Sequence, residues 1–430
     1  MRSLKPRAVS DLGPAWAGSS VNTSIYRQDG VATVDGLQVG AFYDEDGRPT
    51  FFKRDALNAR VELRRLEEPS EPWDGHRSIS LGIDADGRIH AAYGAHGDAL
   101  RYVRGGKGLD LATIAPAELG PTDRPTYPMF VRHGPGNGEL ALFYRRGGAS
   151  NGDIMLKRFD RSKERWRDGG RPLLEGTASS RPSGPYLNRL LTTADGAVHG
   201  FLAWRLKLAA GEERVVNSGL DLVAFVDDLR RVAAPSGFRF APPIGAAQAE
   251  RVVAVPFDGD LINQGGAELD PQGVPAAATW WRDPGEAAPQ FRLVHRAADG
   301  FRAVKASAFT TPFTLAGRGT LVLPHSRPAL LFSREGHAVL VYRSREIGGA
   351  LAANVLAPPD YRFVGRTLLW DEDLGAYEPI VDHAAWREGG VLSVLLQRCA
   401  QPPRDGSGER TSAEARVVEW AEDEILARAE

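Results

Sequence analysis

The sequence predicts an all-β protein, and specifically a seven-bladed β-propeller. One pattern recurs seven times along the chain: an apolar run, a turn that contains glycine, and a second apolar run. The glycines of these turns lie at positions 47, 87, 138, 196, 273, 336 and 390, which are 40 to 77 residues apart. That spacing is enough for one four-stranded blade with its loops. Helical periodicity is nearly absent before residue 412.

The second unit shows the pattern most clearly. Residues 73–102 read WDGHRSISLGIDADGRIHAAYGAHGDALRY, with the turn Asp84-Ala85-Asp86-Gly87 at their centre. Asp and Gly tolerate the positive φ that tight hairpin turns require, so this stretch predicts two antiparallel strands. The other units are expected at 37–55, 127–146, 186–206, 262–283, 327–346 and 380–399.

The two ends of the chain are expected to complete the fold. Residues 412–430 predict a last strand followed by a short helix. In a propeller the first and last strands usually pair and close the ring, which leaves only short sheet edges. We expect a single domain over residues 1–430, because the sequence contains no Pro/Ser linker that would divide it. The rival arrangement is one large β-sandwich or two smaller ones.

Composition excludes several classes of protein. The 430 residues are 42% hydrophobic and 25% charged, as in globular proteins, and the net charge of −2 gives no basic field for nucleic acid. The one cysteine, Cys399, rules out an internal disulfide and a Cys-based zinc cluster. The sequence contains no run of 18 apolar residues, so it predicts no membrane-spanning helix. The N-terminus lacks the apolar region of a signal peptide, so the protein works inside the cell or its native signal was replaced. We expect a monomer.

Polar and aromatic residues recur where the predicted strands start or end. Because the outer ends of a hairpin share one edge of a sheet, the side chains of neighbouring units are expected to converge on one rim of the propeller. Histidines near the turns, His90 and His199, are expected to be structural. The rim candidates are His76, His96, Tyr127, Arg145, Tyr186, Asn188 and Arg205.

These residue types suit β-elimination from a uronic acid polysaccharide. The reaction needs a group that offsets the carboxylate charge, a base that takes the proton on the adjacent carbon, and an acid that protonates the departing glycosidic oxygen. Arginine matches a carboxylate with two donors, and His and Tyr carry protons without a metal. Glycoside hydrolysis ordinarily requires two carboxylates, in which this rim is poor. The usual nucleotide, zinc-peptidase and hydrolase motifs are absent from the sequence.

The motifs D-G-H-R-S-I-S-L-G-I-D-A-D-G-R-I-H, P-T-Y-P-M-F, F-Y-R-R-G-G-A-S-N-G-D, P-Y-L-N-R-L and W-W-R-D-P-G resemble those of the BNR-4 type β-propellers. That group includes ulvan lyases and an α-L-rhamnosidase that acts on rhamnose–glucuronate linkages. The motif match is specific in units two to four and weak beyond residue 300. It departs from the family pattern at Arg77–Ile79, Arg146 and Ala149.

The resemblance implies roles for individual residues. His76 and Tyr127 would share the proton transfers, and Arg145 with Tyr186 would meet the carboxylate. His96 is the second histidine of the family motif. Together with Asn188 and Arg205, which the rim pattern adds, it is expected to bind substrate. Some relatives hold a structural zinc, for which Cys399, His325 and His383 are the candidates here, but the chemistry itself would require no cofactor.

The sequence therefore leaves three candidate functions. The first is a polysaccharide lyase that cleaves an acidic glycan of the rhamnose–glucuronate type. The second is an α-L-rhamnosidase-like glycoside hydrolase on the same kind of glycan. The third is a propeller that binds carbohydrate without catalysis, since the fold alone does not fix function.

Overall fold

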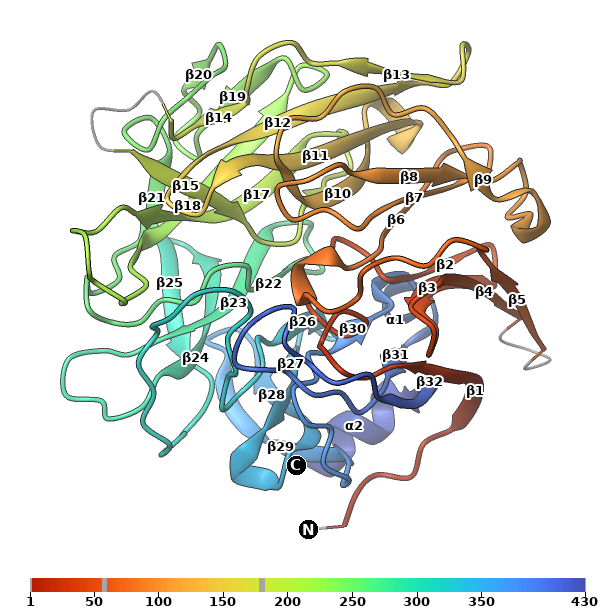
Figure 1. Ribbon diagram of the computed structural model, residues 1–430. Helices are drawn as coiled ribbons and strands as arrows, with labels where there is room; N and C mark the ends of the chain where they lie inside the picture. Colours follow the sequence, from red (N-terminus) through yellow and green to blue (C-terminus); the bar gives the residue numbers. More distant parts are fainter. Residues whose placement is uncertain (1, 56–59, 178–181, 430) are drawn as a thin grey trace.

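The computed structural model describes residues 2–55, 60–177 and 182–429. Their strands form seven antiparallel sheets, which surround a common centre (Figure 1). The all-β propeller predicted from the sequence is confirmed. Each of the seven predicted hairpin units lies in a different sheet.

In chain order, the first four sheets contain the strands β2–β5, β6–β9, β10–β14 and β15–β21. Their bounds are β2 Val31–Val34, β3 Leu37–Tyr43, β4 Pro49–Asp55, β5 Val61–Arg65; β6 Ser80–Ile83, β7 Ile89–Tyr93, β8 Arg101–Arg104, β9 Ala115–Pro116; β10 Pro125–His133, β11 Glu139–Gly148, β12 Asn151–Asp160, β13 Arg165–Asp168, β14 Leu174–Glu175; and β15 Ser183–Leu187, β16 Leu191–Thr192, β17 Val198–Leu206, β18 Asn217–Val226, β19 Arg231–Ala233, β20 Arg239–Phe240, β21 Glu250–Val253.

The remaining three sheets follow the same plan, and the last contains both chain ends. Their strands are β22 Gly266–Leu269, β23 Pro275–Trp281, β24 Gln290–Ala297, β25 Gly300–Lys305; β26 Ala329–Phe332, β27 Ala338–Ser344, β28 Ala350–Ala357, β29 Arg362–Trp370; and β30 Ile380–Val381, β31 Val391–Leu396, β32 Ser412–Ala421 with β1 Ala8–Trp16. Two α-helices, α1 His383–Gly389 and α2 Glu422–Ala429, and four short 3₁₀ segments complete the described elements. Neither α-helix has the length and apolar character needed to cross a membrane.

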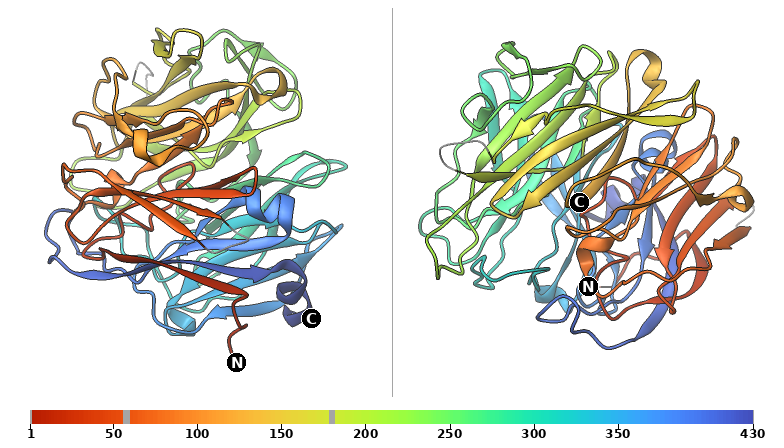
Figure 2. Two further views of the ribbon diagram at one scale, coloured as in Figure 1. Left: turned by 90° about the vertical axis from the view of Figure 1, so that its right-hand side faces the viewer. Right: turned by 45° about the horizontal axis from the view of Figure 1, so that its top comes forward.

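Strand β1 pairs antiparallel with β32, with Val9 opposite Val418 and Trp16 opposite Ser412. The N-terminal strand therefore supplies the outer strand of a sheet whose other members come from the C-terminal end of the chain. The termini lie close together as a result (Figures 1 and 2). The strand and short helix predicted for residues 412–430 are present as β32 and α2.

The hydrophobic core lies between neighbouring sheets. Phe143 of β11 and Phe225 of β18 belong to consecutive sheets, are fully buried and have ring centroids 5.1 Å apart. Most central strands are buried on both faces, as in β27, where all seven residues are buried. This explains why the apolar runs of the sequence are nearly continuous and do not alternate with period two.

Two units differ from the predicted pattern. In the first, the turn at Gly47 joins the second and third strands of its sheet, β3 and β4, and not the first two. In the seventh, the residues expected to form a hairpin turn at Gly389-Gly390 instead form helix α1 between β30 and β31. Asp382 accepts hydrogen bonds from the amides of Ala384 and Ala385 and so caps the helix, which explains why this segment leaves the strand pattern.

Candidate functional site

A cavity of about 400 Å³ lies where loops of several sheets meet at one face of the propeller. Six of the seven residues predicted for the rim line it, and Asn188 does not. These six are His76, His96, Tyr127, Arg145, Tyr186 and Arg205. The structure thus brings residues from three sequence units to one place, although their roles are not tested by this placement.

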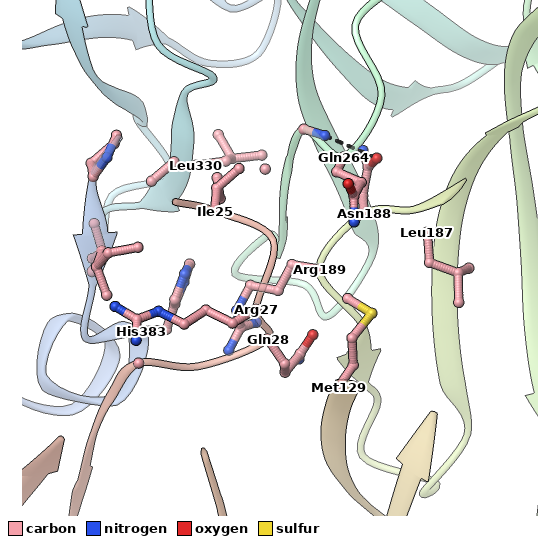
Figure 3. Close-up of a pocket in the computed structure, with 17 residues that line it drawn as sticks. Ile25, Arg27, Gln28, Met129, Leu187, Asn188, Arg189, Gln264, Leu330 and His383 are labelled. Carbon is pink, nitrogen blue, oxygen red and sulfur yellow. Dashed lines mark hydrogen bonds between the residues drawn. The ribbon is translucent and has the colours of Figure 1, made fainter. Parts of the chain in front are cut away.

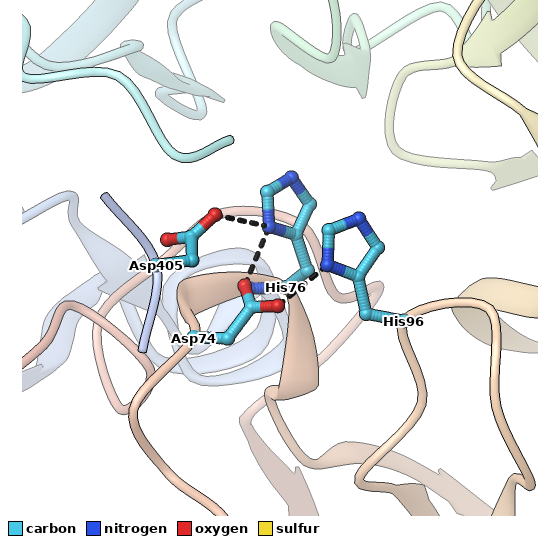
Figure 4. Close-up of side chains that lie close together, drawn as sticks. All are labelled: Asp74, His76, His96 and Asp405. Carbon is cyan, nitrogen blue, oxygen red and sulfur yellow. Dashed lines mark hydrogen bonds and ion pairs between the residues drawn. The ribbon is translucent and has the colours of Figure 1, made fainter. Parts of the chain in front are cut away.

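The carboxylate of Asp74 lies next to the Nδ1 atoms of both His76 and His96 (Figure 4). One carboxylate oxygen, Oδ1, accepts hydrogen bonds from the backbone amide of His76 at 2.9 Å and from its Nδ1 at 2.7 Å. The other oxygen, Oδ2, lies 2.5 Å from Nδ1 of His96. Asp74 also caps the 3₁₀ turn Gly75–Arg77, which fixes the backbone at His76. The two Nε2 atoms point away from the carboxylates and have no hydrogen-bond partner among the described residues.

The imidazole of His76 is also fixed by stacking on both of its faces. The ring of His96 lies 4.0 Å from it at an interplanar angle of 15°, and the ring of Tyr26 lies 4.8 Å from it at 12°. Thr320 and Asp405 approach its Nδ1 at 3.1 and 3.5 Å. Hydrogen bonding through one nitrogen and stacking on both faces leave the Nε2 atom as the reactive end of the ring.

The environment changes the protonation of this group. Burial lowers the pKa of His76, but the hydrogen bonds and negative charges of Asp405 and Asp74 outweigh burial, so that its pKa lies above the ordinary value of 6.5. Burial would raise the pKa of Asp74, yet its hydrogen bonds and charge interactions with His76 and His96 hold that pKa far below its usual range. Asp74 is therefore a carboxylate throughout the neutral pH range.

Tyr127 has an unusual backbone conformation. Its φ is +54°, in the left-handed region that non-glycine residues rarely adopt, and the β10–β11 register shifts between Thr126 and Met129. Such a bulge redirects a side chain out of the regular strand alternation. Here the side chain lies against the cavity, 5.7 Å from His76 and 5.8 Å from Tyr186 between ring centroids. Backbone strain of this kind costs about 1–3 kcal/mol and is concentrated at functional sites.

Tyr127 is a neutral phenol at ordinary pH. Burial, followed by the neighbouring Tyr186 and Tyr26, raises the pKa of Tyr127 well above 10, against the opposing influence of Arg145 and Arg205. It can therefore donate a proton but is a poor base in its resting state.

Arg145 lines the cavity, but most of its N–H groups donate hydrogen bonds to backbone carbonyls. It donates from Nε to the carbonyl of Pro185 and from Nη1 to that of Gly147, and Nη2 donates to Gly148 and Ala149. Its guanidinium also stacks over Tyr186, 4.5 Å from the ring centroid. Arg145 thus holds the 147–149 loop and Tyr186 in place while contributing positive charge to the cavity.

Three other arginines have donors available at the cavity. Arg205 donates from Nε to Asn217 and from Nη2 to Asn263, and its Nη1 has no hydrogen-bond partner in the described part of the chain. The side chains of Arg124 and Arg318 are exposed, and neither forms a hydrogen bond or ion pair with another described residue. Among the described residues that line the cavity there is no Asp or Glu. The cavity is therefore suited to an anionic ligand.

Asn188 lies away from the cavity that the other predicted residues line. It is 3% exposed, and its side-chain oxygen accepts a hydrogen bond from the amide of Gly265. It lines a separate cavity of about 40 Å³ with Gln264 and His383 (Figure 3). A third cavity, of about 440 Å³, shares Gln28 and Arg189 with the small one. Asn188, predicted on the rim, therefore does not join the other six residues, because its side chain bonds to Gly265 just before β22.

The residues considered for a structural metal do not meet. Cys399 contacts Thr23, His325 contacts Ser344, and His383 contacts Glu268. A different set, Asp74, His76, His96 and Asp405, offers four ligand atoms within 4.8 Å of one another. Its imidazole nitrogens lie 2.7 and 2.5 Å from the Asp74 oxygens, closer than the roughly 3.3 Å between two ligands on a tetrahedral zinc ion. We therefore interpret the set as a hydrogen-bond network.

The sequence did not single out several residues of the site. They come from loops far apart in the chain and carry no local motif, so only the folded ring brings them together. Tyr26 stacks on His76, and Arg327 lies 4.9 Å above Tyr26 while it is paired with Glu378. Other residues at or beside the cavity that were not predicted include Arg124, Asn263, Arg318, Thr320 and Asp405. His90, expected to be structural, is fully buried in its sheet beside Tyr102.

The Asp74 network gives a testable titration. In the wild type, His76 should titrate above 6.5, and Asp74→Asn should lower its pKa because a neutral amide no longer stabilises the imidazolium. Histidine ring signals followed by NMR over a pH series would measure both values. Asp98→Asn is the control, since Asp98 pairs with Arg77 and does not contact the His76 ring. An unchanged His76 pKa in Asp74→Asn would show that the network does not control this group.

Comparison with known proteins places this geometry in a family. A search of curated protein sequences finds no match. Among solved structures, an ulvan lyase of polysaccharide lyase family 25 bound to -[GlcA(1-4)Rha3S]- is 12% identical, with a TM-score of 0.65 over 97% of this chain and 98% of the other. The polysaccharide lyase Uly1 is 13% identical, with a TM-score of 0.67 over 96% and 99%. At this identity the likeness shows the shared fold. The model of the BNR repeat-containing family matches residues 37–308, and the chain belongs to that family.

Proposed function

We propose that the protein is a polysaccharide lyase that cleaves an acidic glycan of the rhamnose–glucuronate type by β-elimination. The observation that carries the proposal is the pairing of a histidine bonded to a carboxylate, His76, with a neutral phenol, Tyr127, in one cavity. The described residues that line this cavity include arginines and no Asp or Glu. The fold shared with two polysaccharide lyases and the glycan held by one of them support the same class of substrate.

His76 acts as the base in this mechanism. Its Nδ1 donates to Asp74, so the neutral tautomer leaves the lone pair of Nε2 free to accept the proton on the carbon next to the uronate carboxylate. As that proton leaves, negative charge develops on the carboxylate side of the sugar. The charge of Asp74 then stabilises the imidazolium that forms, as its effect on the pKa of His76 indicates.

Tyr127 acts as the acid. Its phenol gives its proton to the glycosidic oxygen as the bond between that oxygen and the sugar ring breaks, and the electron pair of the broken C–H bond becomes the new double bond. The raised pKa of Tyr127 keeps it protonated until this step. Transfer of the proton from His76 to solvent and reprotonation of Tyr127 complete the cycle.

Arg205 is the side chain best suited to contact the uronate carboxylate. Its Nη1 has no hydrogen-bond partner among the residues that the structure describes, whereas Nε, Nη1 and Nη2 of Arg145 all donate to backbone carbonyls. Asn263 and Asn217 orient the Arg205 guanidinium toward the cavity, and its cation also lies 5.2 Å from the Tyr186 ring. Arg145 adds positive charge and positions Tyr186. The adjacent charges make the carbon-bound proton more acidic, which is the main electrostatic requirement of the reaction.

A conventional glycoside hydrolase is less well supported by this site. That chemistry places two carboxyl groups on either side of the scissile bond. The carboxylates of Asp74 and Asp405 both lie on the Nδ1 side of His76. Neither lines the cavity.

The proton-transfer roles predict the effect of two substitutions. His76→Ala and Tyr127→Phe should each lower kcat by about 10²–10⁴-fold, the usual contribution of a positioned acid or base. The measurement is the ultraviolet absorbance of the unsaturated uronate released from rhamnose–glucuronate polysaccharides. Tyr102→Phe is a matched control, because it removes a buried hydroxyl from a tyrosine that contacts His90 away from the cavity. Wild-type rates in His76→Ala would refute the site assignment.

The carboxylate assignment predicts a substrate-dependent effect. Arg205→Ala should lower kcat/KM on the free uronate by about tenfold to a hundredfold, as expected for losing a hydrogen bond to a charged group worth roughly 1.5–3 kcal/mol. On the same glycan with its carboxylates methyl-esterified, wild type and variant should differ little. An equal loss on both substrates would mean that Arg205 supports the fold of the site and does not bind the carboxylate.

A further inference from the structure

Arg327 is a buried cation at the cavity, and the proposed mechanism gives it no role. It stands shortly before strand β26, lines the cavity and is 5% exposed. Its guanidinium carbon lies 4.9 Å from the centroid of the Tyr26 ring. Burying a charge is unfavourable unless the charge is paired and hydrogen-bonded, so the contacts of Arg327 indicate what this charge is used for.

Glu378 fixes the orientation of the Arg327 guanidinium. The two carboxylate oxygens of Glu378 lie 2.8 and 3.0 Å from Nη1 of Arg327 and also accept hydrogen bonds from the amides of Arg327 and Ile25. Burial would lower the pKa of Arg327, but the charge of Glu378 outweighs burial and keeps that pKa above its ordinary value. Arg327 is therefore a permanent cation whose direction is set before a ligand binds, which lowers the entropic cost of binding.

One terminal nitrogen of Arg327 is left for a ligand. Nε donates to the backbone carbonyl of Asn263 at 2.9 Å, and Nη1 donates to Glu378. Among the described residues, Nη2 contacts only the hydroxyl of Tyr26 at 3.5 Å, which is longer than an ordinary N–H···O hydrogen bond. Nη2 carries two N–H groups, so at least one of them has no partner in the described chain. Tyr26, on the Nη2 side, lines the cavity, whereas Glu378, on the Nη1 side, does not.

Asn263 joins Arg327 to Arg205. The side-chain oxygen of Asn263 accepts a hydrogen bond from Nη2 of Arg205 at 2.9 Å, and its backbone carbonyl accepts one from Nε of Arg327. All three residues line the cavity. A single residue therefore sets the separation of two guanidinium groups. Each group keeps a terminal nitrogen with N–H that no described residue uses fully, Nη1 in Arg205 and Nη2 in Arg327.

A cluster of three tyrosines relates the two arginines to the proposed acid. Tyr127 contacts both of the others, with ring centroids 5.2 Å from Tyr26 and 5.8 Å from Tyr186. Arg327 lies over the ring of Tyr26, and the guanidinium carbon of Arg205 lies 5.2 Å from the centroid of Tyr186. Each neighbour of the proposed acid is thus covered by one of the two arginines.

We infer that Arg327 is a second substrate-binding arginine, which holds the uronate carboxylate together with Arg205. The inference rests on the proposed function and adds that two arginines recognise the free carboxylate of the substrate. A carboxylate has two acceptor oxygens, so Nη1 of Arg205 can bind one and Nη2 of Arg327 the other. As the base removes the proton from the adjacent carbon, negative charge moves onto these oxygens and both hydrogen bonds strengthen.

Arg327→Lys tests this inference. Lysine keeps a cation for Glu378 but has one side-chain nitrogen in place of three, so the bond from Nη2 is lost. On a rhamnose–glucuronate polysaccharide, kcat/KM should fall about tenfold to a hundredfold, as for the loss of a hydrogen bond to a charged group. On the same glycan with methyl-esterified carboxylates, variant and wild type should differ little. An equal loss on both substrates, or no loss on either, would overturn the inference and leave the lyase function intact.

Arg54→Lys is the matched control. Arg54 is 1% exposed and pairs with Glu419, as Arg327 pairs with Glu378, but it does not line the cavity. This variant should keep the wild-type ratio of kcat/KM between the free and the esterified glycan. A selective loss on the free glycan in Arg54→Lys would show that the effect of such substitutions is not local, and would overturn the inference.

A crystal structure of the wild type soaked with glucuronate provides a second test, which requires neither the variant nor turnover. The carboxylate should lie within about 3.2 Å of nitrogens of both Arg205 and Arg327. A carboxylate bound by Arg205 alone, or a cavity without glucuronate, would overturn the inference. If glucuronate contacts both arginines but no unsaturated product forms from the glycan, the proposed lyase function fails and the carboxylate site stands.

Discussion

The closure of the ring by β1 and β32 is the constraint on which the site depends. It brings the C-terminal loop that carries Asp405 beside the second sheet, where Asp74 and His76 lie. Thr320 contacts both, although it lies 244 residues from His76 and 85 residues from Asp405 in the sequence. Without the closing strand pair, the groups around Nδ1 of His76 would belong to three unconnected parts of the chain. The fold therefore supplies the electrostatic environment of His76, not only its location.

The surroundings of His76 include two energetically unfavourable features, a buried carboxylate and a strained backbone, which other interactions must offset. Burying the Asp74 carboxylate is unfavourable unless its oxygens are hydrogen-bonded, and both of them are, to the His76 amide and the two imidazoles. The positive φ of Tyr127 is likewise unfavourable, but it directs the phenol into the cavity. Two departures from low-energy local structure thus meet within one small region. Such concentration is typical of a site selected for chemistry over stability.

The sequence predicted the architecture better than the details of the site. Repeated hairpin signals located every sheet because each turn glycine marks a local event, although helix α1 shows how a capping residue such as Asp382 can redirect a segment. Six rim residues were found because strand ends are local features too. Asn188 was misplaced, because it lies just beyond the end of β15 and its side chain bonds to Gly265, beside the next sheet. Tyr26, Thr320, Asp405 and Arg318 were missed because their positions depend on ring closure, which no short motif encodes.

The role expected for Arg145 also depended on information that the sequence does not contain. A sequence identifies a guanidinium but not how many of its donors the protein consumes. In the structure these donors go to the carbonyls of Pro185 and the 147–149 loop, and Arg205 retains the free nitrogen. Hydrogen-bond satisfaction, which is a property of the whole fold, separates a cation that builds the site from one that contacts a ligand.

The central claim is that the bond is broken by elimination and not by hydrolysis. The most direct test is the mass balance of a single cleavage, measured by mass spectrometry on a purified rhamnose–glucuronate oligosaccharide of defined length. Elimination adds no water, so the masses of the two products should sum to the mass of the substrate. If the summed mass of the two products exceeds the mass of the substrate by one water molecule, the protein is a hydrolase and the account is contradicted.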